Sequence, residues 1–213
     1  MPAERVAAPP PGSRASRTRQ RLLDCTAELV REVPYRELTT ALVTQRLELS
    51  PPAFYRYFAG INEAILGLTA VMRADARDLA TTVRAGSWTA ADAPTTALAV
   101  IDACSEFWQR HRPLYRVAGL VADEGDPRFM EVRAATFADL TAAFRDEIAQ
   151  WKERGKHPAD VDPFATACVV VAMLIHTMAR ESAFGLAGVS PRSLRLHVAR
   201  VLCATVTGDT VRL

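Results

Sequence analysis

The sequence predicts an all-α protein, with a three-helix segment near the N-terminus and a larger helical domain behind it, about nine helices in total. Alanine, leucine, arginine and glutamate are abundant among the 213 residues and glycine is scarce, a composition that favours helices. Apolar side chains recur at the three-to-four spacing of a helix face, and no stretch has the alternation of a strand. With 49% apolar and 23% charged residues, the chain can build a folded core.

Residues 1–15 are expected to form a disordered basic arm, because proline and alanine predominate there and Pro9, Pro10 and Pro11 are consecutive. The first 21 residues carry five arginines and one glutamate, a net charge of +4, so the remainder of the chain sums to −2. A cationic front on a nearly neutral body suits a local contact with nucleic acid, although a basic tail of another kind looks similar.

The first helix is expected from about Ser16 to Glu32. Its apolar side chains, among them Leu22, Leu29 and Val30, fall on one face. Pro34 should end this helix, because the residue before a proline is pushed out of the α region.

Two short helices follow. The second is expected to open at Thr39 and Thr40, and the third to run from Pro51 to Phe58 behind the cap residue Ser50, since proline is favoured in a first turn. The tight link between them, at Glu48 and Leu49, is typical of a helix-turn-helix. The third helix would then fit the major groove of DNA, with its N-terminal residues nearest the base edges.

The same segment could be a helical hairpin inside an ordinary core, because aromatic side chains at helical spacing usually pack. Phe54 to Phe58 is, however, a continuous run of five large side chains. A helix of two turns cannot bury all of them, so some must face outward, where exposed tyrosine and arginine favour a contact surface. The DNA-binding interpretation is therefore preferred.

The segment resembles the TetR family of transcriptional regulators over residues 16–68, about a quarter of the chain. The matching stretches are Gln20–Asp24, Leu38–Thr40, Ser50–Phe58 and Glu63–Leu66, and the run after Ser50 is the most specific of them. The resemblance implies a DNA-binding regulator, more often a repressor, that binds a double-stranded operator as a homodimer. It implies no catalytic residue, cofactor or metal.

The resemblance also implies which residues contact DNA. In the family, the position of Thr39 commonly binds phosphate, and those of Gln45 and Arg46 lie near the DNA. The segment Ser50–Ala53 matches the base-facing start of the recognition helix, and Tyr55–Tyr57 match its groove and backbone contacts. The full predicted DNA-binding set is Arg17, Thr39, Thr40, Gln45, Arg46, Ser50, Pro51, Pro52, Ala53, Tyr55, Arg56 and Tyr57.

Three positions depart from the family pattern. Pro34 replaces the glycine that usually closes the first helix, and Ile61 replaces a basic residue that opens the fourth. Glu48 replaces the glycine of the turn, where a left-handed backbone costs about 1 kcal/mol. Phe54 and Phe58 match core positions of the family rather than contacts to DNA.

Residues 16–60 are expected to form the DNA-binding domain, and residues 61–213 the regulatory and dimerisation domain. A fourth helix is expected from near Asn62 to Arg84. Proline and glycine clusters then separate long helices, which are expected at about 94–110, 113–123, 127–154, 162–184 and 191–206.

The larger domain contains no sharp motif. In TetR-like proteins the corresponding helices enclose a small-molecule pocket, and a lining of Phe, Trp and Met would suit a small hydrophobic effector of unknown identity. His176 lies in a very apolar helix, where a hydrogen-bonded core or interface histidine is the alternative to a ligand contact. The candidate lining residues are Phe107, Trp108, Tyr115, Phe137, Phe144, Met173 and His176.

The helix around residues 164–179 is apolar on nearly every side, which predicts burial against more than its own chain. A partner subunit would meet that need, and paired recognition helices must lie about 34 Å apart to reach successive major grooves. We therefore expect a homodimer with Val170 or Val171 at its interface. An effector that favours another spacing would release the DNA.

Other classes of protein receive little support. No hydrolase, zinc-protease, P-loop or dinucleotide motif occurs, so a helical enzyme remains an alternative without a site. An adaptor or lipid-binding protein is a second alternative, but the arm lacks the apolar face of a membrane-surface helix. The four cysteines are too widely spaced for a zinc or thiol motif. Since no signal peptide or membrane span is recognised, a cytoplasmic protein is expected.

Overall fold

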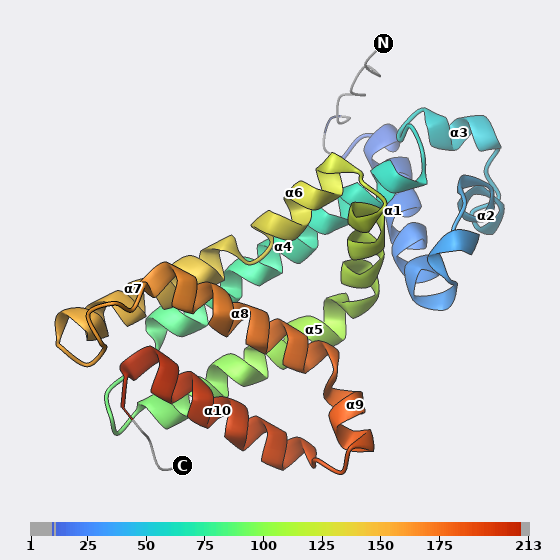
Figure 1. Ribbon diagram of the computed structural model, residues 1–213. Coiled ribbons are helices and arrows are strands. Elements are labelled where there is room, and N and C mark those ends of the chain that lie inside the picture. Colours follow the sequence, from blue (N-terminus) through green and yellow to red (C-terminus); the bar gives the residue numbers. More distant parts are fainter. Residues whose placement is uncertain (1–9, 11, 210–213) are drawn as a thin grey trace. The chain divides into compact units, whose positions relative to one another are not determined.

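The computed structural model describes residue 10 and residues 12–209. This part of the chain folds into ten α-helices and one short 3-10 helix and contains no strand, which confirms the all-α prediction (Figure 1). In chain order these are α1 (Arg14–Glu32), η1 (Tyr35–Glu37), α2 (Thr40–Arg46), α3 (Pro51–Tyr55), α4 (Ile61–Ala85), α5 (Ala93–Asp123), α6 (Pro127–Ala135), α7 (Ala138–Glu153), α8 (Pro163–Ala179), α9 (Glu181–Leu186) and α10 (Pro191–Thr207).

The expected N-terminal arm lies mostly outside the described residues, since residues 1–9 and residue 11 are not among them. Helix α1 begins at Arg14, two residues earlier than predicted. Its start is determined by Ser13, whose hydroxyl oxygen accepts a hydrogen bond from the backbone N–H of Ser16 at 3.0 Å. The helix ends as predicted, because Val33 before Pro34 is extended.

Helices α2 and α3 also start where their caps predict, after Thr39 and Ser50. Helix α3 is shorter than expected. It ends at Tyr55 instead of Phe58, because the backbone N–H groups of Tyr57 and Phe58 both bond to the Phe54 carbonyl and close a turn.

The helix ends in the larger domain were predicted less well. Helix α5 continues through Pro113, where a break was expected. A proline inside a helix costs about 3 kcal/mol, and burial of Val117 and Val121 on the following turns offsets it. In contrast, the single helix expected over 127–154 is divided at Phe137, whose ring packs against Phe107 with the centroids 5.5 Å apart. The helix expected over 162–184 is divided at Arg180.

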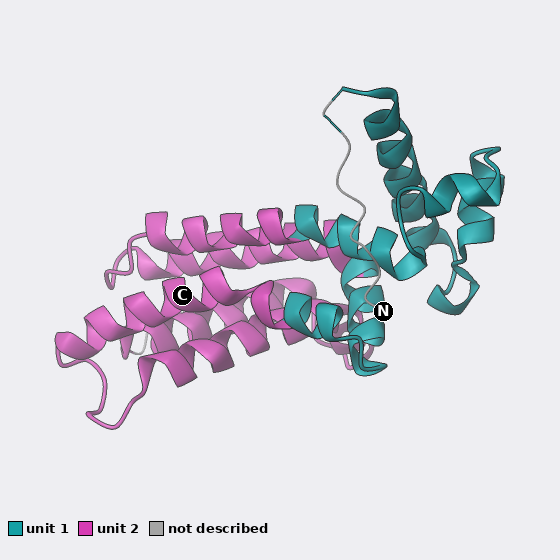
Figure 2. Cartoon of the chain, turned by 90° about the horizontal axis from the view of Figure 1, so that it is seen from above, with its two compact units in different colours: residues 1–72, 113–133 teal, residues 73–112, 134–213 magenta. Residues whose placement is uncertain are grey.

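The chain forms two compact units (Figure 2). Unit 1 comprises residues 1–72 and 113–133, and unit 2 comprises residues 73–112 and 134–213. Helices α4 and α5 therefore contribute residues to both. Unit 1 extends past the expected boundary at residue 60, because Val117, Val121 and Phe129 belong to the same buried cluster as the side chains of α1.

The core of unit 2 is built around α7, which contacts both α8 and α10. Phe144 on α7 is fully buried, and the Trp88 ring packs edge-on against it at 6.2 Å. The indole N–H of Trp88 donates to the Val83 carbonyl at 3.1 Å, so the connector between α4 and α5 is fixed to the end of α4. Among the described residues, no helix combines the length and the apolar character needed to cross a membrane.

Candidate nucleic-acid interface

Helices α1, α2 and α3 are held together by apolar side chains that share one buried cluster. Phe54 and Phe58 are 0% and 1% exposed, and their rings lie 5.5 Å apart. They pack into a cluster that includes Leu22, Leu29 and Val43. Because the apolar side of α3 is fixed in this way, its opposite side must face solvent. The prediction that Phe54 and Phe58 are core residues is confirmed.

The exposed side of α3 consists of Pro51, Pro52, Tyr55 and Arg56, together with the cap residue Ser50. The Tyr55 side chain is 53% exposed although it is large and partly apolar. A large aromatic ring left in solvent at the end of a short helix is unusual in a core element and is expected in a contact surface.

Two members of the predicted DNA-binding set are placed differently. Ala53 is 6% exposed, so the expectation that it faces outward is wrong. Its methyl group is covered by the protein instead of facing solvent. Tyr57 is half-buried and packs against the core cluster, and the Arg56 guanidinium lies 5.9 Å from its ring centre.

A pair of hydroxyl groups links α2 to α3. The Tyr55 and Thr40 oxygens are 3.2 Å apart, within hydrogen-bond distance. At the start of α2, the Thr39 hydroxyl oxygen accepts the backbone N–H of Leu42, also at 3.2 Å. This bond leaves the hydroxyl hydrogen of Thr39 free to be donated to an acceptor outside the protein.

The turn between α2 and α3 is strained, as the sequence predicted. Glu48 has φ 54°, and it is the only residue other than glycine with a positive φ among those described. Its neighbour Leu49 donates its backbone N–H to the Thr44 carbonyl at 2.9 Å, which closes the turn tightly.

Charged residues surround the motif. Arg17 on α1 and Gln45 on α2 are exposed. Arg46 is exposed too, but its guanidinium is paired with the Glu32 carboxylate, at 2.8 Å between Nη2 and Oε2. That hydrogen bond lowers the pKa of Glu32 and raises the pKa of Arg46. This pair could not be predicted from the sequence, because it depends on how α1 and α2 pack.

A second contact within unit 1 was also missed. The Tyr35 hydroxyl lies 2.9 Å from the Asn62 side-chain oxygen and donates to it, which ties η1 to the start of α4. Burial raises the pKa of Tyr35, and the bond to Asn62 counteracts part of this rise. The Glu63 carboxylate accepts the backbone N–H of Ala59 and so caps the entry into α4.

Models of two protein families match the sequence. Residues 22–63 match the bacterial regulatory proteins of the tetR family, and residues 79–212 match the tetracyclin repressor-like C-terminal domain. The second match alone covers more than half of the chain. The chain belongs to the TetR family. The helix-turn-helix of α2 and α3 is thus the DNA-binding motif of a TetR-family transcription regulator.

Solved structures share the fold of this TetR-family protein at low sequence identity. A tetR-family regulatory protein from Rhodococcus RHA1 is 18% identical with a TM-score of 0.64, over 91% of this chain and 97% of that one. A TetR/AcrR regulator from Thermobifida fusca is 17% identical with a TM-score of 0.59, over 88% and 97%. The fatty acid degradation regulator FadR from Bacillus halodurans is 11% identical with a TM-score of 0.63, over 91% and 97%. No curated protein sequence matches the chain.

The seven candidate ligand-binding residues of this TetR-family protein are divided between the two compact units. Phe107, Trp108, Phe137 and Phe144 are buried in unit 2, whereas Tyr115 belongs to unit 1. Met173 is half-buried on α8. His176 is exposed in the single chain, so of the expected core or interface histidine the core placement is wrong, and the interface placement stays a prediction.

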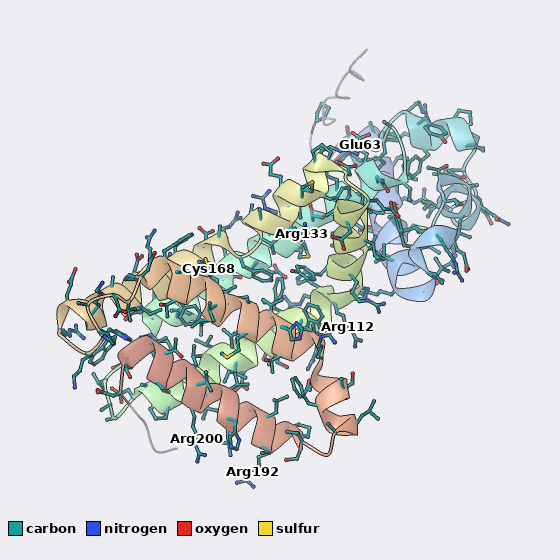
Figure 3. The ribbon with its side chains drawn as sticks, in the orientation of Figure 1. Glu63, Arg112, Arg133, Cys168, Arg192 and Arg200 are labelled. Atoms are coloured by element: carbon teal, nitrogen blue, oxygen red, sulfur yellow. The ribbon has the colours of Figure 1, made fainter. Side chains whose placement is uncertain are left out.

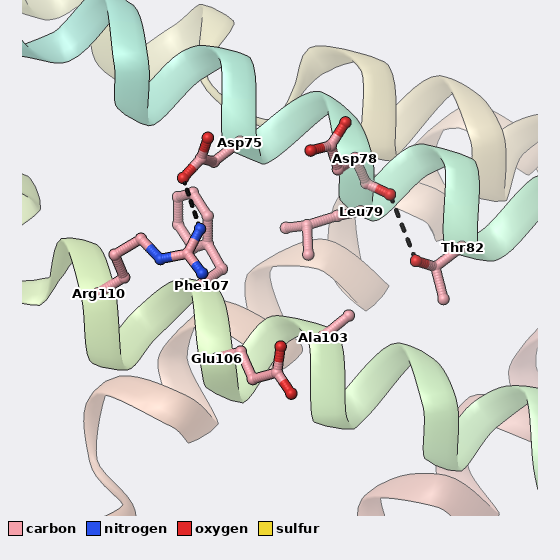
Figure 4. Close-up of a pocket in the computed structure, with 8 residues that line it drawn as sticks. All are labelled: Asp75, Asp78, Leu79, Thr82, Ala103, Glu106, Phe107 and Arg110. Atoms are coloured by element: carbon pink, nitrogen blue, oxygen red, sulfur yellow. Dashed lines mark hydrogen bonds and ion pairs between the residues drawn. The ribbon is translucent and has the colours of Figure 1, made fainter.

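A cavity of about 160 Å³ opens in unit 2 between α4 and α5 (Figure 4). Of the candidate lining residues, only Phe107 borders it. Leu79, Ala103 and Phe107 form its apolar part, and charged side chains surround them. The full lining is Asp75, Asp78, Leu79, Thr82, Ala103, Glu106, Phe107 and Arg110. Three carboxylates and one guanidinium give this lining a net formal charge of −2.

Neither the cysteines nor the histidines form a metal site in the described residues, where no group of three potential ligands occurs. Cys25, Cys104 and Cys203 are buried free thiols, and burial raises the pKa of Cys104 to about 12. Cys168, labelled on α8 in Figure 3, is exposed.

Proposed function

We propose that this TetR-family protein binds a double-stranded DNA operator as a homodimer and represses transcription until a small effector releases it. The observation that supports DNA binding most directly is the exposed side of α3. Tyr55, Arg56 and the two prolines face solvent, while Phe54 and Phe58 anchor the same short helix in the core. A recognition helix needs this combination of a fixed inner side and a free outer side.

The predicted contacts fall into two groups. Phosphate contacts are assigned to Arg17, Thr39 and Gln45, which are exposed and carry donors, and to Arg46 once it leaves Glu32. Base contacts are assigned to the first turn of α3, because the N-terminal residues of a recognition helix lie nearest the base edges. Tyr55 and Arg56, which are exposed at the other end of α3, are assigned contacts in the groove as well.

The homodimer is proposed from the exposed sides of α8 and α10, which contact each other within unit 2 (Figure 1). Phe164 and Val169 on α8 are 54% and 67% exposed, and Val201 on α10 is 49% exposed. Apolar side chains that are this exposed on neighbouring helices favour a protein interface. Val170 and Val171, which the sequence suggested for the interface, are buried within the chain itself, so that expectation is wrong.

The effector is proposed to bind in the cavity between α4 and α5. The sequence suggested a hydrophobic effector, but the charged lining fits a small molecule that combines an apolar part with a cationic group. The Asp75 carboxylate, which accepts a hydrogen bond from Arg110, would then be shared between Arg110 and the cationic group of the ligand. FadR from Bacillus halodurans is a regulator of fatty acid degradation. A fatty acid carboxylate would be repelled by this lining, so no fatty acid is proposed as the effector of the present chain.

Release of DNA requires that the effector and the operator favour different states of the dimer. Binding of the effector must then lower the affinity for the operator by the same factor by which binding of the operator lowers the affinity for the effector. Since the proposed partner is DNA, the site of action is proposed to be the cytoplasm.

The decisive experiment selects bound duplexes from a random pool with the full chain, and then measures affinity for the best duplex as salt increases. A steep, linear loss of affinity on a logarithmic salt scale is expected for a protein that displaces counterions from phosphates. Failure to enrich any duplex would contradict the DNA-binding proposal. An adaptor or lipid-binding protein would give that result, and so would an enzyme without a DNA role.

A screen for compounds that dissociate the selected duplex tests the second half of the proposal. Small organic cations should release the operator, and the same compounds should bind more weakly when operator is present. Release by fatty acids, with no effect of cations, would contradict the proposed cavity chemistry.

A further inference from the structure

The first turn of α3 offers almost no backbone hydrogen-bond donor. Pro51 and Pro52 occupy its first two positions, and proline has no backbone N–H. The next N–H, that of Ala53, is already bonded to the Ser50 carbonyl at 2.9 Å. A helix start normally presents free N–H groups that bind phosphate, and this one lacks them. The start of α3 must therefore contact DNA in another way.

The same turn presents carbon to solvent. The rings of Pro51 and Pro52 are exposed, and Ala53 is buried behind them. The nearest polar groups are partly occupied, because the Tyr55 hydroxyl is within hydrogen-bond distance of Thr40. Of the first turn and its cap, only the Ser50 hydroxyl is an exposed polar side chain, and it makes no capping bond.

The major groove contains one apolar group, the 5-methyl of thymine, and all its other edge features are hydrogen-bond donors or acceptors. A pair of exposed pyrrolidine rings cannot satisfy a donor or an acceptor, and would leave it dehydrated and unpaired. We propose that Pro51 and Pro52 recognise thymine methyl groups, so that each operator half-site carries thymine where the start of α3 docks. This inference rests on the proposed DNA-binding function and specifies the base that its recognition helix reads.

The test uses the duplex selected by the full chain and replaces its thymines one at a time with deoxyuridine. Deoxyuridine lacks the methyl group but keeps every Watson–Crick and groove hydrogen-bonding atom of thymine. At one or two positions of each half-site the affinity should fall about fourfold, the effect of losing one buried methyl group. Replacement in both half-sites should lower it about 15-fold. Thymines outside the half-sites serve as the control and should be insensitive.

A protein variant connects the effect to the prolines. Pro51→Ala/Pro52→Ala should bind thymine and deoxyuridine operators equally well, because the apolar partner of the methyl group has been removed. The matched control is Pro191→Ala, which removes an exposed proline from the same first position of α10, behind Ser190. That control should retain the full sensitivity to the methyl group.

The outcomes separate this inference from the function on which it rests. If the unaltered chain binds a selected duplex and no thymine position responds to deoxyuridine, the methyl recognition is wrong and DNA binding stands. If sensitivity persists in the double proline variant, the prolines are not the readers. If no duplex is selected, the DNA-binding proposal fails first, and the inference fails with it. The deoxyuridine series uses the natural sequence, so it remains decisive even if the variant folds poorly.

Discussion

Arg46 donates two hydrogen bonds to Glu32, at 2.8 Å from Nη2 to Oε2 and at 3.3 Å from Nη1 to Oε1. The pair joins α2 to α1 on the exposed side of the DNA-binding motif. Arg46 is one of the residues proposed to contact phosphate, so Glu32 competes with the operator for it. This competition gives a direct prediction about affinity.

Glu32→Gln should strengthen operator binding about two- to fivefold, because it frees the Arg46 guanidinium for a phosphate. Stability should hardly change, since both side chains are exposed. Titration of a labelled operator at low salt measures the effect.

Loss of an acidic side chain near DNA raises affinity by itself, so a charge-matched control is needed. Glu28→Gln removes an exposed carboxylate one turn earlier on α1 and should raise the affinity less. In an Arg46→Ala background, Glu32→Gln should add nothing. Equal gains from Glu28→Gln and Glu32→Gln would show that the pairing is irrelevant.

Phe58→Ala and Tyr55→Ala should have opposite signatures. Phe58 is fully buried and lies under the Arg19 guanidinium at 5.0 Å, so its truncation should cost about 3–5 kcal/mol of unfolding free energy. Tyr55 is mostly exposed, and its truncation should weaken operator binding while leaving the denaturation midpoint nearly unchanged. Denaturant titrations and operator titrations of both variants give the comparison. A stable Phe58→Ala protein would contradict its place in the core.

The starts of the short helices could be predicted from sequence because they depend on local chemistry. Thr39 caps α2 through its own hydroxyl, Pro51 suits the first turn of α3, and Pro34 keeps Val33 out of the helical region. The residues that mark these boundaries therefore also cause them. The strain at Glu48 was predictable for the same reason, since a side chain is costly wherever the turn requires a left-handed residue.

Features that depend on packing between distant segments could not be predicted. Pro113 looked like a helix end, but burial along α5 outweighs its local cost. In a helix of only five residues, a small rotation about the helix axis decides whether Ala53 faces solvent or the core. The cavity residues were missed because aromatic character was used as the guide, and most aromatic side chains of unit 2 fill its core.

Val169→Lys should convert the proposed homodimer to monomers, because it places a charge at an apolar contact between subunits. Val169 is 67% exposed in the single chain, so the fold itself should tolerate the change. Leu186→Lys on α9 is the control, since that side chain is 92% exposed outside the α8 and α10 surface. Light scattering at matched concentrations distinguishes the two. A dimer that survives Val169→Lys would place the interface elsewhere.

Gly208→Ala should destabilise the protein by about 2–4 kcal/mol, from two independent causes. Gly208 ends α10 with φ 75°, a left-handed conformation that disfavours a side chain. A Cβ atom there would also overlap the Lys156 carbonyl oxygen. Gly188→Ala isolates the first cause, because it has φ 84° and no atom within 4 Å of the added Cβ. It should cost only about 1 kcal/mol. Equal shifts of the melting temperature in both variants would show that the overlap with Lys156 does not contribute to the loss of stability.

Asp75→Asn should make the protein less stable at neutral pH and less sensitive to acid. His111 is buried, and its Nε2 lies 2.8 Å from Asp75 Oδ2, while Arg110 Nη1 lies 2.9 Å from the same oxygen. Burial acts to raise the pKa of Asp75, but the hydrogen bonds from His111 and Arg110 outweigh it and hold the pKa below its usual value. The folded state therefore favours the ionised carboxylate more than the unfolded state does.

The resulting stabilisation is complete above the unfolded pKa, near pH 4, and disappears as the pH falls through the lower folded pKa. The Asp75→Asn substitution should lower the free energy of unfolding by about 1–2 kcal/mol at pH 7, since an amide oxygen is a weaker acceptor for His111 and Arg110 than a carboxylate. It should also remove this part of the loss as the pH falls below about 4. Asp78→Asn, one turn away on α4 and without an ion-pair partner among the described residues, should change neither. Denaturation midpoints measured across this range would refute the role of Asp75 if its variant and the natural protein lost stability in parallel.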